Sequence, residues 1–382
     1  MRALIIRRAV AANRPGPYAP ARLRGLLHSL LMTLAPDPSA APTEDRLLQR
    51  VHAAGLVPLW DFFKEWFAAE PRPAAIPNLW RYADVRPVVM EAGAAISAAD
   101  AERRVLVLEN PGLEGRHLAT DALYAGLQLI LPGEFARTHR HTAAALRFIV
   151  EGNDTYTAVA GERCYMRPGD FIVTPSWTWH EHRNEGTSPT VWLDVLDVPL
   201  IRFLGAGFSE HYPEPTFPAT APPGDSQLRY GRNLLPVGYR RGAGASPVFA
   251  YPFDYAYEAL EHLRAHSDWD ACHAVKMEYI DPTTGGPAIP TISTFLQLLP
   301  RGFATAAYRT TASSVVTVVR GRGRVTIGTD AAARSFDYEP NDIWAVPSWQ
   351  TVSIAAHDES VLFSASDEAV HRKLGVWREQ RS

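Results

Sequence analysis

Four histidines in the first half of the chain are spaced so that they can do chemistry. His139 and His141 stand two positions apart in a run that predicts a β-strand, so both imidazoles are expected on one face. His180 and His182 follow a predicted turn at Gly169–Asp170, and we expect His180 to end the strand after that turn. Three neutral imidazoles without a thiolate suit Fe(II), Zn(II), Mn(II) or Ni(II) and leave coordination positions open. The spacing predicts a metal site formed by His139, His141 and His180.

The sequence around these histidines occurs twice. LQLILPGEF at 127–135 resembles LQLLPRGF at 296–303, and MRPGDFIVTPSWTW at 166–179 resembles YEPNDIWAVPSWQT at 338–351. Both copies keep an acidic turn (PGD, PND) and a PSW corner. An internal duplication of a β-barrel explains the repeat, and we expect the two barrels to pack together.

The second copy serves as an internal comparison for the histidines. An alternative interpretation is that His-x-His on a strand is only a half-buried polar pair. In the alignment His139 corresponds to Tyr308, His141 to Thr310 and His180 to Val352. A fold that needed these histidines for its structure would have kept them in both copies. We therefore expect one metal per chain, in the first copy, with the second copy as scaffold.

The elements that position these residues are predicted to be mostly strands. From about residue 105, short apolar or alternating runs are separated by Gly and Pro at intervals of about 8–12 residues, which is typical of a sandwich or barrel. We therefore predict an all-β dominated fold of two barrels with an N-terminal helical arm. The expected segments are an arm and lead-in at 1–100, the metal-binding barrel at 101–202, a linker with one helix at 203–290, and the second barrel at 291–382.

Helices are predicted at three places outside the barrels. The apolar run Leu23–Leu34 predicts a short helix in the arm. The segment Thr43–Ala69 has a helical pattern that Pro58 should interrupt. Asp254–Ser267 has apolar residues at helical spacing within the linker segment.

Composition excludes several classes of function. The 382 residues include 38 Lys and Arg against 41 Asp and Glu, so no basic field for nucleic acid or for a membrane surface is expected. Only two cysteines occur, Cys164 and Cys272, too few for a disulfide framework, which favours a reducing cytoplasm. No apolar stretch is long enough for a membrane span.

Several motifs carry a resemblance to a known family. HRHTAAALRFIVEG, MRPGDFIVTPSWTWHEHRNEG, VWLDVLD, AERRVL, LYAGLQLILPGE and TGGPAIPTISTFLQLL resemble segments of the gentisate 1,2-dioxygenase family, which includes salicylate and 1-hydroxy-2-naphthoate dioxygenases. The likeness runs from about residue 55 to the C-terminus. It implies a bicupin, that is, two double-stranded β-helix barrels, and a homotetramer.

The resemblance also implies a reaction and a set of site residues. The family uses one Fe(II) and O2 to cleave the bond between the carboxyl-bearing C1 and the hydroxyl-bearing C2 of a small aromatic acid. His139, His141 and His180 match the iron ligands. The catalytic residues would be His182 as acid or base, Arg147 as a fork for the carboxylate, and Asp194 at the far side of the ring. Arg103 and Gln128 would join these three in the substrate pocket, and Tyr124 and Gly126 would form its wall.

Gentisate is the substrate that the resemblance favours. Val195 and Arg137 stand where the family usually has Gly and Pro, and this departure favours salicylate, a 5-nitro- or 5-halo-salicylate, or 1-hydroxy-2-naphthoate as the alternative. Other enzyme classes with the same three histidines are thiol and diketone dioxygenases, but Arg103 and Arg147 favour a carboxylated aromatic. A non-catalytic binding or storage bicupin and a cupin sensor are the remaining alternatives.

Overall fold

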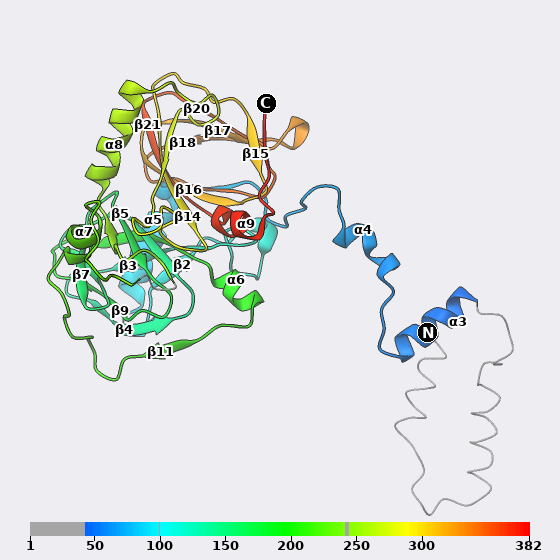
Figure 1. Cartoon of the computed structure of the whole chain (residues 1–382), viewed down its shortest axis with the longest axis horizontal. Helices are drawn as coiled ribbons and strands as arrows, with labels where there is room; N and C mark the ends of the chain where they lie inside the picture. Colours follow the sequence, from blue (N-terminus) through cyan, green and yellow to red (C-terminus); the bar gives the residue numbers. More distant parts are fainter. Residues whose placement is uncertain (1–42, 99, 241–243) are drawn as a thin grey trace, which may run out of the picture. The chain divides into compact units, whose positions relative to one another are not determined.

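The computed structural model describes residues 43–98, 100–240 and 244–382 (Figure 1). The chain divides into two compact units, residues 1–68 and residues 69–382. The predicted helix at Leu23–Leu34 lies outside the described residues. No helix among the described residues is both long enough and apolar enough to cross a bilayer.

The described part of the first unit consists of short helices. These are α3 (Glu44–Ala53), η1 (Leu59–Asp61) and α4 (Phe63–Trp66). The expected continuous helix is interrupted earlier than predicted, at Gly55, which has φ +73°. The Leu56 N–H donates to the Val51 carbonyl at 2.9 Å, so a left-handed glycine closes the helix before Pro58 is reached.

The second unit contains two barrels, each made of a six-stranded and a five-stranded sheet. The first barrel has the order β12 (Ala250–Tyr251), β8 (Phe171–Thr174), β5 (Ala145–Glu151), β10 (Thr190–Leu196), β3 (Tyr124–Ile130), β2 (Val105–Val107) in one sheet. Its other sheet has the order β11 (Ser209–His211), β4 (Phe135–His141), β9 (His180–Asn184), β6 (Thr155–Val159), β7 (Glu162–Met166).

The second barrel repeats this order. Its larger sheet is β1 (Asn78–Trp80), β19 (Ile343–Val346), β16 (Ser314–Arg320), β21 (Ser360–Ser366), β14 (Ser293–Leu299), β13 (Val275–Glu278). Its smaller sheet is β18 (Arg334–Tyr338), β17 (Gly323–Ile327), β20 (Val352–Ala356), β15 (Tyr308–Thr310), β22 (Glu379–Arg381). The predicted all-β dominated fold of two barrels is confirmed. The segment limits at residues 101, 203 and 291 stay a prediction.

Strand register confirms the duplication residue by residue. In the first barrel His139 pairs with His180, and in the second Tyr308 pairs with Val352. The alignment of the two copies in the sequence made the same correspondence. The positions of the histidines and of their replacements are therefore equivalent in space.

The two barrels share one hydrophobic core between their larger sheets. Phe148 of β5 stacks on Phe363 of β21 at 4.2 Å between ring centroids, and both belong to one buried cluster. Val195 of β10 is fully buried in the same cluster. Its side chain therefore faces the second barrel and not the interior of the first, so the expectation that the departure at this position favours an alternative substrate is wrong for Val195. Alternation along a strand places Asp194, not Val195, on the inner face.

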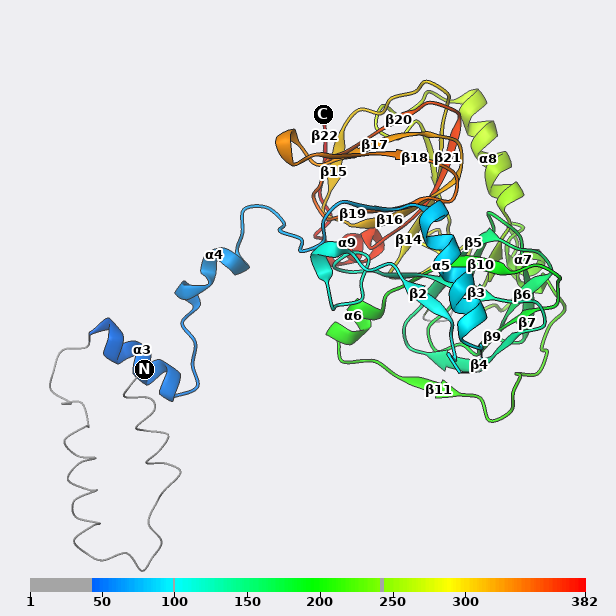
Figure 2. The ribbon, with the colours of Figure 1, turned by 180° about the vertical axis from the view of Figure 1, so that it is seen from behind.

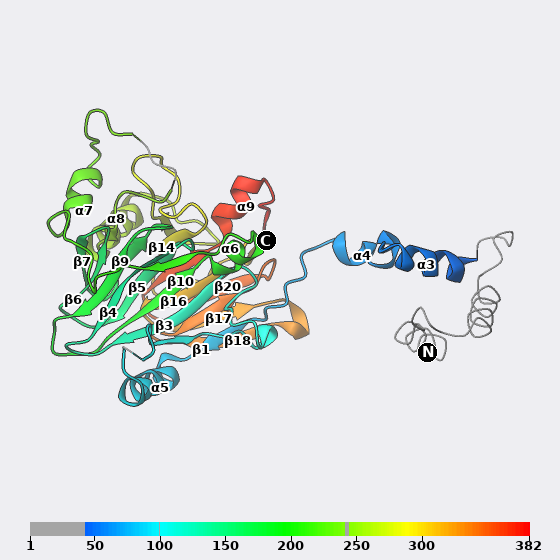
Figure 3. The ribbon, with the colours of Figure 1, turned by 90° about the horizontal axis from the view of Figure 1, so that it is seen from below.

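The helices of the second unit cover the barrels. They are α5 (Tyr82–Ala95), α6 (Val198–Phe203), α7 (Asp225–Tyr230), α8 (Phe253–His266) and α9 (Glu368–Leu374), with the short turns η2 (Pro111–Leu113) and η3 (Asp330–Ala332). Figure 2 shows α5 beside β2 and β3. Figure 3 shows α5 and α8 on opposite sides of the barrels. The predicted helix Asp254–Ser267 is confirmed as α8.

The acidic turns of the two copies have the same structural role. Asp170 accepts from the Arg167 N–H at 3.1 Å and from the Phe253 N–H at 2.9 Å, the latter at the first residue of α8. Asp342 accepts from the Glu339 N–H at 3.0 Å and from the Tyr82 N–H at 2.8 Å, the first residue of α5. Each carboxylate thus ties a strand turn to the N-terminus of a helix, where negative charge is favoured.

Candidate metal centre

Three histidines of the first barrel converge on one point. One ring nitrogen from each of His139, His141 and His180 lies within 4.8 Å of the others. The ring centroids are 4.2 Å apart for His139 and His180, 4.9 Å for His141 and His180, and 5.2 Å for His139 and His141. The pairing of β4 with β9 shifts register between Ala136 and His139. Such a bulge bends a strand and re-aims the side chains that follow it.

His180 begins β9 and does not end the preceding strand as predicted. Strand β8 stops at Thr174, before Pro175, which has no N–H to donate to a ladder. The chain then turns through Trp177, whose φ is +58°. Trp177 N–H donates to the His141 carbonyl at 2.8 Å, and the Ser176 hydroxyl donates to the Thr142 carbonyl at 2.6 Å. The PSW corner therefore holds the end of the strand that carries His141.

The hydrogen bonds of the histidines leave ligand atoms free. His141 Nδ1 donates to the Ala143 carbonyl at 2.6 Å, and His180 Nδ1 donates to the Thr178 carbonyl at 2.9 Å. A carbonyl only accepts, so each Nδ1 carries the proton and each Nε2 presents a lone pair. His180 Nε2 is buried without a hydrogen-bond partner. Burial lowers the pKa of His141 to about 4 and that of His180 well below its usual value. Neutral imidazoles aimed at one point fit a divalent cation.

His182 lies beside the three converging histidines in the barrel interior. Its ring is fully buried, 5.9 Å from that of His180 and 5.1 Å from the Trp192 ring. Its Nδ1 is 2.9 Å from the Thr157 hydroxyl, and its Nε2 is buried without a partner. Burial holds the pKa of His182 well below its usual range, so the ring is neutral.

A buried ion pair completes the interior next to the histidines. Arg147 Nε and Asp194 Oδ1 are 3.5 Å apart, and the two residues are 3% and 5% exposed, respectively. Arg147 also donates to the Thr174 hydroxyl, and Trp192 Nε1 donates to Asp194 Oδ1 at 3.0 Å. Burial raises the pKa of Asp194 to about 6, while Arg147 acts in the opposite direction. The pair supplies a fixed guanidinium in a water-poor interior.

Arg103 lies against one of the three histidines. Its Nη2 donates to the Arg137 carbonyl at 2.7 Å and contacts the His139 ring. Burial lowers the pKa of Arg103 to about 10, with a further contribution from Arg147. The neighbouring Arg104 instead forms a buried ion pair with Glu134, so only one of the two arginines of AERRVL faces the histidines.

The predicted pocket wall lies on β3. Gln128 is 4% exposed and pairs in register with Trp192, whose indole is buried inside the barrel. Gly126 pairs with Asp194, and a Cβ added to it would lie 2.6 Å from Val105 Cγ1 and 3.2 Å from the Tyr124 hydroxyl. The structure therefore brings all ten predicted site residues into the first barrel, on β3, β4, β5, β9, β10 and the segment before β2.

Three residues near the site were not predicted. Thr157 and Thr174 are the hydroxyl partners of His182 and Arg147. His211 of β11 pairs with His139 in register, and its ring lies 6.4 Å from that of His139. His211 is largely exposed and is not one of the three converging ligands. His211 lies in a Pro-rich segment that gave no sequence signal for it, because only the pairing of β11 with β4 brings it near His139.

Comparisons with known proteins agree with this geometry. Residues 126–196 match the family profile described as Cupin domain. Gentisate 1,2 dioxygenase 1 of Aquipseudomonas alcaligenes is 44% identical to this chain over 351 residues, which cover 92% of this chain and 100% of that protein. The chain belongs to the gentisate 1,2-dioxygenase family.

Other members of the family act on related acids. The 5-aminosalicylate 1,2-dioxygenase of Comamonas sp. is 35% identical over 91% of this chain and 92% of that protein. The crystal structure of a salicylate 1,2-dioxygenase from Pseudaminobacter salicylatoxidans matches with a TM-score of 0.82 at 30% identity, over 90% of this chain and 99% of that one. As a gentisate 1,2-dioxygenase family member the chain is an oxidoreductase with a cupin fold.

Proposed function

We propose that this chain is an iron(II)-dependent dioxygenase that opens the C1–C2 bond of gentisate. The observation that supports it most directly is the group of three neutral histidines around one point, with the Nε2 of His180 buried and unpartnered. His139, His141 and His180 would hold the iron(II), which would supply a common binding point for the aromatic acid and O2 and a path for electrons between them. One iron per chain is expected, because the equivalent residues of the second barrel are Tyr308, Thr310 and Val352.

The residues around the histidines have distinct tasks in this proposal. Arg147 offers a guanidinium that is already oriented by Asp194 and Thr174, so it holds the substrate carboxylate with little loss of side-chain entropy. Arg103 closes the site at the rim. His182 accepts the proton of a ring hydroxyl at Nε2, because its Nδ1 is engaged by Thr157. Gly126, Tyr124 and Gln128 limit the width of the site on the β3 side.

Salicylate and its 5-substituted forms are the second candidate substrates. The specific observation in their favour is that a salicylate 1,2-dioxygenase superposes on nine-tenths of this chain, and that enzyme has also been crystallised with gentisate. Gentisate is preferred because the gentisate dioxygenase of A. alcaligenes is covered along its whole length. The homotetramer and the cytoplasmic location stay predictions.

The test is oxygen uptake by the iron-loaded protein with gentisate, salicylate, 5-nitrosalicylate and 1-hydroxy-2-naphthoate in parallel. We expect uptake and a new absorbing ring-opened product with gentisate. Uptake only with acids that lack the para hydroxyl would move the assignment to salicylates. If iron-containing protein took up no oxygen with any of the four acids, the proposed reaction would be refuted.

Two alanine variants test the metal site in the same assay. His180→Ala should lose both bound iron, by elemental analysis, and oxygen uptake. His211→Ala is the matched control, since it removes the neighbouring exposed histidine and should keep its iron. Retained iron and activity in His180→Ala would show that the metal is held elsewhere.

A further inference from the structure

The second barrel contains a cavity that the proposed function does not use. Its volume is about 460 Å³, within the range of small-molecule sites. The cavity occupies the place that corresponds to the metal centre, because Tyr308 and Val352 line it at the positions of His139 and His180. Duplication has therefore left a second interior that is hollow and lacks the metal ligands.

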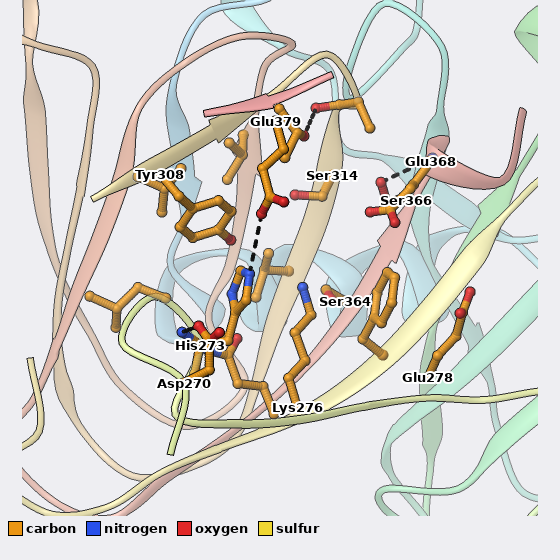
Figure 4. Close-up of a pocket in the computed structure, with 18 of the residues that line it drawn as sticks. Asp270, His273, Lys276, Glu278, Tyr308, Ser314, Ser364, Ser366, Glu368 and Glu379 are labelled. Carbon is orange, nitrogen blue, oxygen red and sulfur yellow. Dashed lines mark hydrogen bonds and ion pairs between the residues drawn. The ribbon is translucent and has the colours of Figure 1, made fainter. Parts of the chain in front are cut away.

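One cation points into this cavity without a partner. Lys276 of β13 extends upward between Tyr308 and Ser364 in Figure 4. In the part of the chain that the structure describes, its amine makes no hydrogen bond or ion pair, and its Nζ lies over the Phe295 ring, 4.3 Å from the centroid. Burial lowers the pKa of Lys276, although Glu368, Glu278 and Glu379 oppose the shift. A desolvated ammonium is costly unless an anion compensates it.

Three of the five carboxylates that line the cavity form ion pairs with arginines. Glu368 pairs with Arg372 at 2.6 Å, and Asp270 pairs with Arg381 at 2.6 Å. Glu379 lies 3.0 Å from the same Arg381. Burial raises the pKa of Glu278, while a hydrogen bond with Ser293 acts in the opposite direction. Among the lysine and arginine side chains that line the cavity, Lys276 is the one for which the described residues show no ion pair.

The remaining walls are apolar or carry neutral donors. Trp344, Phe295 and Val316 line the cavity, with Val352 and Ile354 at the positions of His180 and His182. Gln297 and Ser364 line it as well, and Gln297 pairs with Lys276 in register. An apolar wall beside one ammonium suits an organic acid better than an inorganic anion, because the carbon skeleton also gains from burial.

We propose that the second barrel binds a small monocarboxylic acid, with Lys276 as the cation that holds the carboxylate. Phe295 and Trp344 enclose the apolar part of the ligand, and Gln297 and Ser364 offer it hydrogen bonds. The site is a binding site and not a second catalytic centre, since Tyr308, Thr310 and Val352 do not form a three-imidazole metal site.

Crystals of the iron-loaded enzyme soaked in 4-bromobenzoate test this proposal. This acid has no ortho hydroxyl, and the anomalous signal of bromine locates it in either barrel independently. We expect a bromine peak in the second-barrel cavity with the carboxylate at Lys276 Nζ. If wild-type crystals show no bromine peak in the second-barrel cavity, whether or not the first barrel shows one, the proposal is overturned.

Substitutions of the lysine test its role in solution. Lys276→Met should weaken binding at the second barrel by about tenfold or more, the usual effect of removing a charge-assisted hydrogen bond, while Lys276→Arg should retain binding. Lys373→Met is the matched control, because Lys373 lies on the exposed face of α9. Turnover of gentisate should be unchanged in all three variants, which separates this site from the metal centre. Equal affinity in Lys276→Met and wild type would refute the role of Lys276.

Discussion

At the level of single residues, the two barrels differ in a buried ion pair whose two members are both replaced in the second barrel. Arg147 and Asp194 pair in register in the first barrel, and Val316 and Ser364 occupy the equivalent paired positions in the second. A buried ion pair is costly to break on one side, because the charge that remains has neither partner nor water. The loss of both charges together in the second barrel is what this cost predicts.

The pair therefore allows a test that separates stability from catalysis. Arg147→Val should destabilise the fold by about 3–5 kcal/mol, since Asp194 stays buried without its partner. Arg147→Val combined with Asp194→Ser, which copies the second barrel, should recover most of that loss, while kcat/KM for gentisate stays low. Urea unfolding and oxygen uptake measure the two quantities. Additive destabilisation in the double variant would show that the pair is not coupled.

His273 in the second barrel predicts a pH dependence of stability. Burial lowers its pKa from 6.5 to about 3, with a contribution from Lys276, and its Nδ1 is buried without a partner. The neutral ring is favoured in the folded state, so its contribution is complete above the unfolded pKa and is lost as the pH falls toward the folded pKa. Between pH 6.5 and 5 the loss is about 2 kcal/mol.

Unfolding by urea at pH 7 and pH 5 measures this contribution. The wild-type free energy of unfolding should fall by about 2 kcal/mol more than that of His273→Gln over this interval. The glutamine variant is suitable because it does not titrate yet keeps a polar side chain of similar length. Parallel changes in the two proteins would assign the acid sensitivity to other groups.

At the scale of elements, the repeated corners and turns explain why the two copies keep certain residues. Trp177 and Trp349 both have positive φ, +58° and +62°, and each donates its N–H to the residue that ends the paired strand, His141 or Thr310. Ser348 donates to the Thr311 carbonyl at 2.6 Å, as Ser176 does in the first copy. The corner is therefore needed for strand geometry in both barrels, and in the first it also fixes a metal ligand.

The acidic turns predict a stability effect without a catalytic one. Asp342→Ala removes two acceptors, one in the turn and one at the start of α5, and should cost about 2–3 kcal/mol of unfolding free energy. The turn lies in the second barrel, so kcat and KM for gentisate should stay unchanged in the folded fraction. Thermal unfolding and steady-state oxygen uptake provide the measurements. A change in KM larger than the loss of folded protein would connect this turn to the metal centre.

Sequence patterns predicted the three converging histidines but not the residues that hydrogen-bond to the other side chains of the site. The equivalence of His139 with Tyr308 followed from the repeat, because a duplicated fold preserves register. Thr157 was not predicted, since its contact with His182 depends on how β6 pairs with β9. Val195 was interpreted wrongly, although the alternation of β10 places it opposite Asp194, because a motif comparison does not record which face a residue occupies.

At the scale of the whole molecule, the two barrels of the second unit are joined through a single core. Phe363 of the second barrel contacts Phe148, Phe171 and Tyr279, with ring centroids 4.2, 5.7 and 6.1 Å away. Those partners belong to the first barrel and to the segment that leads into the second. Each barrel has a buried cluster of its own, but the third cluster contains residues of both barrels, so separating them would expose apolar side chains on each.

This shared core predicts that the barrels unfold as one cooperative unit. Phe363→Ala removes a fully buried ring from the centre of the cluster and should cost about 3–5 kcal/mol. The metal ligands lie on the far side of β10, so iron content per folded chain should remain that of wild type. Calorimetry of the variant should give a single transition at lower temperature. Two separated transitions, with the iron-binding barrel melting at its original temperature, would contradict the shared core and make the second barrel an independent domain.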